Sequence, residues 1–371
     1  MPTVGVSVVV PTYCEAENLP RLVPRVAAAL TARGWPWEII VVDDNSPDNT
    51  PAVLTELSGQ WPQFRYLIRK TVRGLSSAVL AGMAEAHYDY LLVMDADLSH
   101  PPESILSLID PLLRGSAEFV IGSRYVAGGK TEDWGRFRWL NSAVATMLCR
   151  PLAQGVHDPM AGFFAVPRQV YLTANQLNPI GYKIALELIV KGRVSRIVEV
   201  PIVFHNRLHG ESKLTLREQL KYLEHLSRLY DYKFPIAAPR IKYFIVALGA
   251  ALVGVILFVL GHTLVGWPFL PGLAAGLAGV FTVVLLFFIY DIRIRKSDLI
   301  IRYSGVKFII IGILEFIAGL AAGELSAPYT GRFTAVLISI VVMLLIHYFL
   351  YVCQCGHRST ATTNSRKTMK M

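Results

Sequence analysis

Short runs of β-branched residues alternate with longer segments of helical periodicity over the first part of the chain. The runs predicted as strands are Val6–Val10, Ile39–Val42, Tyr90–Met94 and Phe119–Ile121, and the predicted helices are Ala16–Ala32, Gly74–Ala86 and Pro101–Leu113. Strands that alternate with helices predict a mostly parallel sheet, because parallel strands need helical crossover connections. Ligands of such sheets bind beyond the carboxyl ends of the strands, so the loops after these runs are where chemistry is expected.

The last third of the chain has a different pattern, with long apolar segments separated by short polar ones. A membrane-spanning helix needs about 17–25 apolar residues, and four segments meet that length. They cover residues 243–260, 265–290, 303–323 and 333–355. The sequence therefore predicts an α/β domain over residues 1–238, an all-α domain of four transmembrane helices over 239–356, and a basic tail over 357–371.

The distribution of charge identifies which half faces which environment. The chain of 371 residues has a net charge of +9, of which residues 239–371 carry +8 and residues 1–238 only +1. A basic excess confined to the apolar half argues against a nucleic-acid partner. Lys and Arg gather before the first span, between the second and third, and after the fourth, and such residues mark the cytoplasmic side of a membrane. We therefore expect a multi-pass membrane protein whose first domain and both termini are cytoplasmic.

Two further segments combine apolar residues at helical spacing with interleaved basic residues. They cover residues 136–152 and 213–234, and the second runs directly into the first predicted span. Basic amphipathic helices can lie in the plane of the lipid headgroups, and we expect both segments to contact the bilayer. The alternative is that they pack on their own domain as ordinary surface helices.

Polar or acidic residues follow three of the predicted strands. These segments are Pro11–Glu15, Asp43-Asp44 and Asp95-Ala96-Asp97. Two carboxylates one residue apart can both reach one hard cation, and Mg²⁺ or Mn²⁺ fills its remaining positions with phosphate oxygens and water. Either acidic pair alone is equally well explained as solvated carboxylates at a loop tip. Together, at one edge of the sheet, they favour a site for a nucleoside diphosphate.

Other ionisable and small residues carry weaker signals. Four scattered cysteines fit neither a disulfide framework nor a zinc site. Glu315 falls within a predicted span, where it is either functional or hydrogen-bonded to a neighbouring helix. Gly272 and Gly276 predict a close contact between helices. Residues without metal-ligand spacing, which we expect at the surface or in loops, are His205, His209 and His225.

In combination, the motifs resemble those of the polyprenol-phosphate (dolichol-phosphate) mannose synthases of glycosyltransferase family 2. The resemblance covers about residues 4–216 and implies a GT-A fold, with a Rossmann-like, mostly parallel sheet and two interfacial helices. The four-span domain is similar to GtrA-type membrane modules. The matching segments, in family order, are VSVVVPTYCEAENLP, IIVVDDNSPDNT, VMDADLSHPPE, FVIGSRYVAGG, DPMAGFFAVPR, NPIGYKIALE and EVPIVFHNRLHGESKL.

The resemblance assigns roles by position. Asp95 and Asp97 match the metal-carrying motif, so Mg²⁺ or Mn²⁺ is the implied cofactor. Ser99 is a further metal position; it replaces a longer Gln, so we expect it to reach the metal through water, and Cys14 stands where the family often has Asn. The implied donor-binding residues are Pro11, Tyr13, Glu15, Val42, Asp43, Asp44, Asp95, Ala96, Asp97, Arg124, Arg207 and Lys213. The implied lipid-phosphate residues are Arg124, Arg136 and Arg138, and the implied catalytic residues are Asp95, Asp97, Arg124 and Arg138.

The implied reaction is inverting transfer of mannose from GDP-mannose to a polyprenyl (dolichyl) monophosphate. A phosphate monoester has a second pKa of about 6, so the acceptor is largely ionised at pH 7 and needs no dedicated general base. Arginine suits the task of holding two anionic reactants, because its planar fork pairs bidentately with phosphate. Two alternatives stay open: UDP-glucose as donor to the same lipid, and a non-catalytic protein that handles or flips lipids. The sequence names no protein partner.

Overall fold

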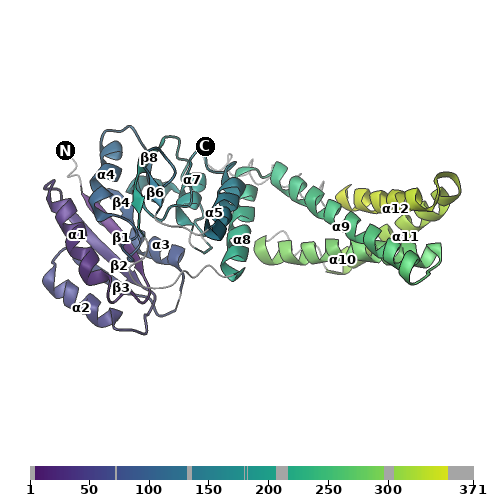
Figure 1. Ribbon diagram of the computed structural model, residues 1–371, viewed down its shortest axis with the longest axis horizontal. Coiled ribbons are helices and arrows are strands. Elements are labelled where there is room, and N and C mark those ends of the chain that lie inside the picture. Colours follow the sequence, from purple (N-terminus) through teal and green to yellow (C-terminus); the bar gives the residue numbers. More distant parts are fainter. Residues whose placement is uncertain are drawn as a thin grey trace, which may run out of the picture. The chain divides into compact units, whose positions relative to one another are not determined.

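The computed structural model describes residues 5–71, 73–131, 136–178, 180–181, 183–205, 216–295 and 305–349. The chain divides into two compact units, and the division falls between Leu229 and Tyr230. The first unit contains the sheet and the helices around it, whereas the second consists mainly of long helices (Figure 1).

A seven-stranded sheet forms the centre of the first unit, with strand order β3-β2-β1-β4-β7-β5-β8. Neighbouring strands are parallel except for β7, which runs antiparallel to both β4 and β5. The mostly parallel sheet predicted from the sequence is thereby confirmed. Its strands are β1 (Val6–Thr12), β2 (Trp37–Asp43), β3 (Phe64–Ile68), β4 (Tyr90–Val93), β5 (Phe119–Ser123), β7 (Phe164–Pro167) and β8 (Ile197–Pro201). The short strands β6 (Lys130–Thr131) and β9 (Val203–Phe204) pair separately.

Helices cover both faces of this sheet, which explains why β1 and β2 are buried along their whole length. Alternate residues of β1, such as Val8 and Val10, join the core cluster with α1 and α4, while Val9 lies against Gly82 of α3. A β-carbon at Gly82 would lie 2.4 Å from Val9 Cγ1, so only glycine allows this close approach. The helices are α1 (Leu19–Thr31), α2 (Thr50–Gln60), α3 (Leu75–Glu85), α4 (Ile105–Leu113), α5 (Arg136–Cys149), α6 (Arg168–Thr173), α7 (Ile184–Lys191) and α8 (Leu216–Lys233).

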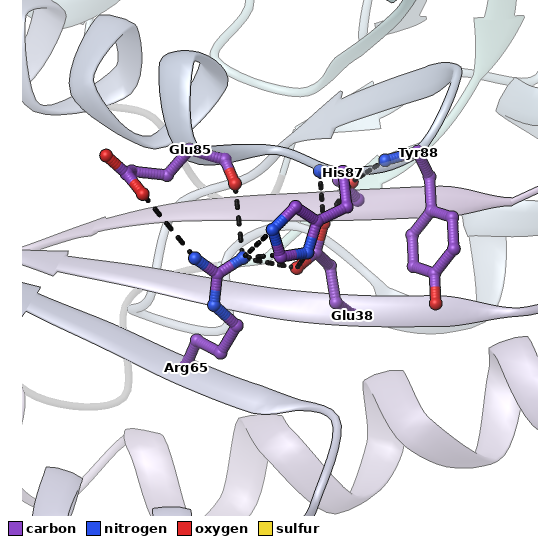
Figure 2. A network of polar contacts seen from close by, with 6 residues as sticks. Glu38, Arg65, Glu85, His87 and Tyr88 are labelled. Carbon is purple, nitrogen blue, oxygen red and sulfur yellow. Dashed lines mark hydrogen bonds and ion pairs between the residues drawn. The ribbon is translucent and has the colours of Figure 1, made fainter.

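A polar network holds the strands together where β1 and β2 begin, at the opposite edge from their carboxyl ends. The buried Glu38 carboxylate accepts hydrogen bonds from the Ser7 hydroxyl (2.7 Å), the His87 amide (2.7 Å) and Arg65 Nη1 (2.8 Å). Figure 2 shows Arg65 reaching across to Glu38 and to the Glu85 carbonyl, beside the His87 ring. One buried carboxylate thus ties β1, β2 and β3 to the loop that leads into β4.

The helix α8 packs on the first unit through two buried contacts. His225 is 1% exposed, and its Nε2 lies 3.0 Å from Glu187 Oε2 in α7. The Tyr222 hydroxyl donates a 2.6 Å hydrogen bond to the Ala145 carbonyl in α5. The prediction that His225 is a surface or loop residue is wrong, because this face of α8 is turned onto α7. His205 is exposed as predicted, and His209 lies outside the described residues.

The second unit contains the helices α9 (Ala237–Leu264), α10 (Phe269–Arg295), α11 (Gly305–Thr330) and α12 (Arg332–His347). Within the described residues, three helical segments are long and apolar enough to cross a membrane: 237–264, 269–287 and 310–330. The apolar helix α12 is shorter, and part of the fourth predicted span lies outside the described residues. The four-span topology therefore stays a prediction.

Small residues bring α9 and α10 close together. A β-carbon on Gly276 would lie 2.7 Å from the Gly254 carbonyl oxygen, and one on Gly272 would lie 3.3 Å from the Phe258 ring. The close helix contact predicted at Gly272 and Gly276 is confirmed. Small residues at a helix interface let the two backbones come into van der Waals contact, which larger side chains would prevent.

A buried polar cluster joins three helices of the second unit. Glu315 of α11 lies 3.1 Å from His347 Nδ1 of α12, and both side chains are almost completely buried. The Tyr243 ring of α9 stacks on the His347 ring, and its hydroxyl donates a 2.8 Å hydrogen bond to the Leu344 carbonyl. Of the two roles considered for Glu315, the structure therefore supports the bond to a neighbouring helix.

Candidate active site

The three polar segments predicted from strand ends meet at one edge of the sheet. They follow β2, β1 and β4, which are neighbours in that order, and the strands are parallel. Each segment contains, or is followed directly by, a non-glycine residue in the left-handed region, with φ values of 61° at Cys14, 54° at Asn45 and 61° at Leu98. Because the three strands are adjacent and parallel, the polar groups at their carboxyl ends lie at the same edge of the sheet.

The acidic pair after β2 is buried rather than solvated. Asp43 Oδ2 accepts a hydrogen bond from the Ser46 amide (2.9 Å), and Asp44 Oδ2 accepts one from the Gly74 amide (2.7 Å). Arg69 Nε donates to Asp44 Oδ1 at 2.7 Å. These two carboxylates therefore order the loops around the β2 end, and the alternative of a solvated pair at a loop tip is wrong for them.

The segment after β1 is fastened to the segment after β2. The Cys14 amide donates to Ser46 Oγ (2.8 Å), and the Glu15 amide donates to Thr50 Oγ1 (3.0 Å). The Tyr13 ring is 38% exposed and has the Arg73 guanidinium 6.0 Å from its centroid. By contrast, the three apolar residues among the predicted donor-binding positions are buried: Pro11, Val42 and Ala96.

The segment after β4 offers two carboxylates with different surroundings. Asp97 is buried, and its Oδ1 accepts hydrogen bonds from the Ser99 amide (3.1 Å) and the Ser99 hydroxyl (2.6 Å). The Asp95 side chain is 29% exposed, and its oxygens are so close to Gly162 that a β-carbon there would lie 3.2 Å from Oδ2. Because residue 162 is glycine, its backbone can lie next to the Asp95 carboxylate. A larger residue at this position would crowd the carboxylate oxygens.

These two carboxylates could bind a hard divalent cation whose other ligands are not protein atoms. Among the described residues, no group of three or more His, Cys, Asp or Glu side chains is arranged to hold a metal ion. Mg²⁺ and Mn²⁺ accept such a site, because they are often bound by one or two carboxylates together with water and substrate phosphates. The Ser99 hydroxyl proton is directed at Asp97, so Ser99 orients that carboxylate; its role as a metal position stays a prediction.

A buried histidine supports the second acidic segment. The Asp95 amide donates to His100 Nδ1 at 3.1 Å, which places the proton of a neutral ring on Nε2. The ring stacks on Phe163 with 5.1 Å between centroids. Burial lowers the pKa of His100 below its ordinary value, even though the nearby Asp95 and Asp97 act in the opposite direction. The ring is therefore a neutral support, which sequence analysis missed because a lone histidine carries no pattern.

Arg124, which follows β5, is paired with a carboxylate of the same unit. Its Nε and Nη2 donate to the two oxygens of Asp158, each at 2.7 Å. The Asp158 amide in turn donates to Glu199 Oε1 at 2.9 Å. The guanidinium also lies 5.3 Å from the centroid of the Phe204 ring. Asp158 belongs to the quoted DPMAGFF segment, but its pairing joins residues 34 positions apart and has no sequence signature.

A lysine at the beginning of α7 completes this part of the site. Lys183 is partly buried, and its Nζ donates to the Met160 carbonyl at 3.2 Å. Burial and the neighbouring Arg124 charge lower the pKa of Lys183 to about 7, against the opposing pull of Asp158 and Asp95. The GYK segment has no local pattern that marks this lysine, because its contact with Met160 joins residues 23 positions apart.

Comparison with known proteins now decides the family. A profile of glycosyl transferase family 2 matches residues 7–172, which include β1 to β7 and both acidic segments. The dolichol-phosphate mannosyltransferase of Pyrococcus furiosus is 45% identical over 251 residues, which cover 67% of this chain and 70% of the relative. The chain belongs to glycosyl transferase family 2.

Two further relatives of this family 2 glycosyltransferase have similar names. The dolichol-phosphate mannosyltransferase of Saccharomyces cerevisiae is 40% identical over 237 residues, covering 62% of this chain and 88% of the relative. The polyprenol monophosphomannose synthase of Mycolicibacterium smegmatis is 38% identical over 223 residues, covering 58% and 82%. The predicted family and its GT-A fold are therefore confirmed.

Several predicted positions of the glycosyltransferase fall outside what the structure describes. Arg207 and Lys213 lie outside the described residues, and the side chains of Arg136 and Arg138 are likewise not described, although both belong to α5. Their roles toward donor and lipid phosphates stay predictions. The described residues bring together Asp95, Asp97, Ser99 and the segments after β1 and β2.

Proposed function

We propose that the chain transfers mannose from GDP-mannose to a polyprenyl monophosphate and releases GDP. The observation that carries the proposal is the Asp95-Ala96-Asp97 segment at the carboxyl edge of the sheet, in a chain 45% identical to a dolichol-phosphate mannosyltransferase. A membrane-bound acceptor fits a chain whose described residues include three helices of membrane-spanning length.

The reaction is a single displacement at the anomeric carbon. A phosphate oxygen of the acceptor attacks this carbon, the bond to the GDP oxygen breaks, and the configuration inverts. Because the acceptor is ionised at neutral pH, no residue has to remove a proton from it. A divalent ion, when held by Asp95 and Asp97, would neutralise the charge that develops on the departing diphosphate.

The chain's own residues prepare the two binding regions. Buried hydrogen bonds on Asp43 and Asp44 order the region where base and ribose would lie, with Tyr13 exposed beside it. The Ser99 hydroxyl orients the Asp97 carboxylate by donating a hydrogen bond to it, and His100 Nδ1 accepts a hydrogen bond from the Asp95 amide. Arg124 keeps its geometry through its two hydrogen bonds to Asp158, and a guanidinium held in this way suits a phosphate ligand.

The membrane arrangement is part of the proposal. We place the catalytic domain, residues 1–238, and both termini in the cytoplasm, with four spans and a basic tail. Residues 136–152 and 213–234 would lie at the headgroups, where Arg136 and Arg138 would meet the lipid phosphate. The supporting observations are the +8 charge of residues 239–371 and the basic residues that flank the apolar segments.

The test replaces Asp97 in the full-length protein and measures labelled mannose transferred to polyprenyl phosphate. Asp97→Ala should lower transfer by about 100-fold or more, because it removes charge stabilisation from the reacting diphosphate. The matched control is Asp89→Ala: Asp89 is exposed and precedes β4, whereas Asp97 follows it. Undiminished transfer by Asp97→Ala, with both variants folded, would refute the proposed role of the acidic segment.

A donor panel tests the sugar independently. GDP-mannose, UDP-glucose and UDP-N-acetylglucosamine are supplied in turn with polyprenyl phosphate and either Mg²⁺ or Mn²⁺. Labelling from GDP-mannose supports the proposal, and labelling from UDP-glucose alone replaces it with the glucosyl alternative. Absence of transfer from every donor would favour the lipid-handling alternative.

A further inference from the structure

The segment between α5 and β7 connects three parts of the site. Its Asp158 accepts two hydrogen bonds from the Arg124 guanidinium. The carbonyl of its Met160 accepts a hydrogen bond from Lys183 Nζ. Its Gly162 lies next to the Asp95 carboxylate. The ammonium of Lys183 therefore belongs to the same polar surroundings as the acidic segment after β4. The charges of Arg124, Asp158 and Asp95 all act on it.

The order of the strands divides the site into two sides. The segments after β2 and β1 lie on one side of the Asp95–Asp97 segment, which follows β4. On the other side, beyond β4, lie the segment that enters β7 and Arg124 after β5. If the base of the donor lies near Asp44 and its diphosphate near Asp95, the β7–β5 side of the site is available to the acceptor.

The described charges on the β7–β5 side are an ion pair and one further basic group. The Arg124 guanidinium and the Asp158 carboxylate form the ion pair, which is close to neutral as a unit. Lys183 lies beside this pair, and its ammonium would attract a phosphate dianion that approaches this side of the site.

We propose that Lys183 binds the phosphate of the polyprenyl phosphate acceptor, beside Arg124 and across from the donor diphosphate. This inference rests on the proposed function, since it assigns a residue to the acceptor of that reaction. Lysine suits the position because its ammonium is a compact charge on a flexible stem, which can turn from the Met160 carbonyl to a phosphate oxygen. A phosphate next to the ammonium would favour its charged form and so oppose the burial that lowers the pKa of Lys183.

The experiment compares Lys183→Met and Lys183→Arg in the full-length protein in detergent. Lys183→Met should raise the KM for a short-chain polyprenyl phosphate about 10- to 100-fold, as expected for the loss of one charged hydrogen bond. The KM for GDP-mannose should change less than about twofold, because the donor side lies across the Asp95–Asp97 segment. Lys183→Arg keeps the charge and should recover most of the acceptor affinity.

The control variant is Arg196→Met, which removes an exposed cation just before β8, at the opposite edge of the sheet. It should leave both KM values unchanged. Equal loss of affinity for donor and acceptor, or an unchanged acceptor KM in Lys183→Met, would overturn the inference. A fall in melting temperature without a selective acceptor effect would assign Lys183 a structural role only, which also overturns it.

Direct binding separates this inference from the proposed function. Binding of the short-chain polyprenyl phosphate to the unmodified protein and to Lys183→Met is measured calorimetrically without donor, so turnover is not needed. If the unmodified protein transfers no mannose, the proposed function fails, whereas this titration still decides whether Lys183 binds a prenyl phosphate. If mannose is transferred and the titrations coincide, only the inference about Lys183 fails.

Discussion

Cys14 adopts a backbone conformation that its side chain does not favour. Its φ of 61° lies in the left-handed region, where the β-carbon of an L-residue crowds the carbonyl oxygen that follows. Asparagine occupies this region several times more often than most residues. The conformation therefore gives a physical reason for the Asn that the family often has at this position.

Replacing Cys14 by Asn should stabilise the protein. Since the left-handed conformation costs roughly 1–2 kcal/mol for an ordinary residue, we expect a gain of about 0.5–1 kcal/mol. Thermal unfolding in detergent measures it as a rise in melting temperature. Cys14→Ser is the matched control, because it keeps the size without the preference, and an equal rise in both variants would contradict the explanation.

At the scale of residues, the sequence located the acidic groups but not their supports. Asp95 and Asp97 were found because carboxylates directly after an apolar strand form a local pattern. Asp158 and Lys183 were not, because the segment carrying Asp158 enters a strand instead of leaving one, and Lys183 meets it across 23 positions. His100 was missed since its contacts with Phe163 and Phe204 depend on the fold alone.

At the scale of elements, the Glu38 network makes the stability of the sheet depend on pH. Burial by itself would raise the pKa of Glu38, but the hydrogen bonds from His87, Ser7 and Arg65 outweigh it and hold the pKa below its ordinary value of 4.5. A lowered carboxyl pKa stabilises the fold fully above the unfolded value and loses that contribution as the pH falls through the folded value. Stability should therefore decline below about pH 4.5.

Glu38→Gln should remove this part of the pH dependence. At pH 7 it should cost about 2 kcal/mol, because it replaces charge-assisted hydrogen bonds in a buried position. Urea unfolding at several pH values should show a shallower decline in acid than the unmodified protein. The control is Glu85→Gln, which removes an exposed contact with Arg65 and should change the free energy of unfolding by less than about 0.5 kcal/mol. Identical pH profiles for the unmodified protein and both variants would contradict the prediction.

Elements with strong local patterns were predicted well, and those fixed by packing were not. The helix expected over Pro101–Leu113 begins as α4 only at Ile105, after a 3₁₀ turn over Pro102–Ser104. The strand β3 is only partly buried and alternates weakly, so it gave no clear signal. The antiparallel β7 escaped prediction because nothing in the FAVP run reveals its direction.

At the scale of the whole molecule, the chain combines two units with different sources of stability. The first is an α/β fold with a continuous apolar core, and the second is a set of long helices with a polar cluster inside. Removing one partner of a buried hydrogen-bonded pair typically costs about 1–3 kcal/mol, whereas replacing both by apolar groups of the same shape can be nearly neutral. The hydrogen-bonded pair of Glu315 and His347 allows both experiments.

Glu315→Ala should therefore lower the stability of the helical unit by about 2 kcal/mol, because the buried hydrogen bond between Glu315 and His347 is lost. The double variant Glu315→Leu with His347→Phe should lose less than about 1 kcal/mol, because apolar groups fill the same space. Differential scanning calorimetry in detergent measures both, while GDP binding reports that the first unit is intact. Equal losses in the single and double variants would show that the pair has a role beyond packing.

The left-handed residues after β1, β2 and β4 have a consequence for how a nucleotide is received. Cys14, Asn45 and Leu98 lie in loops whose conformation is supported by hydrogen bonds within the protein. A preorganised site loses little conformational entropy on binding, so more of the contact energy is kept as affinity. The loss of conformational entropy that orders these loops therefore occurs once, when the protein folds. A site with flexible loops would lose this entropy each time a nucleotide binds.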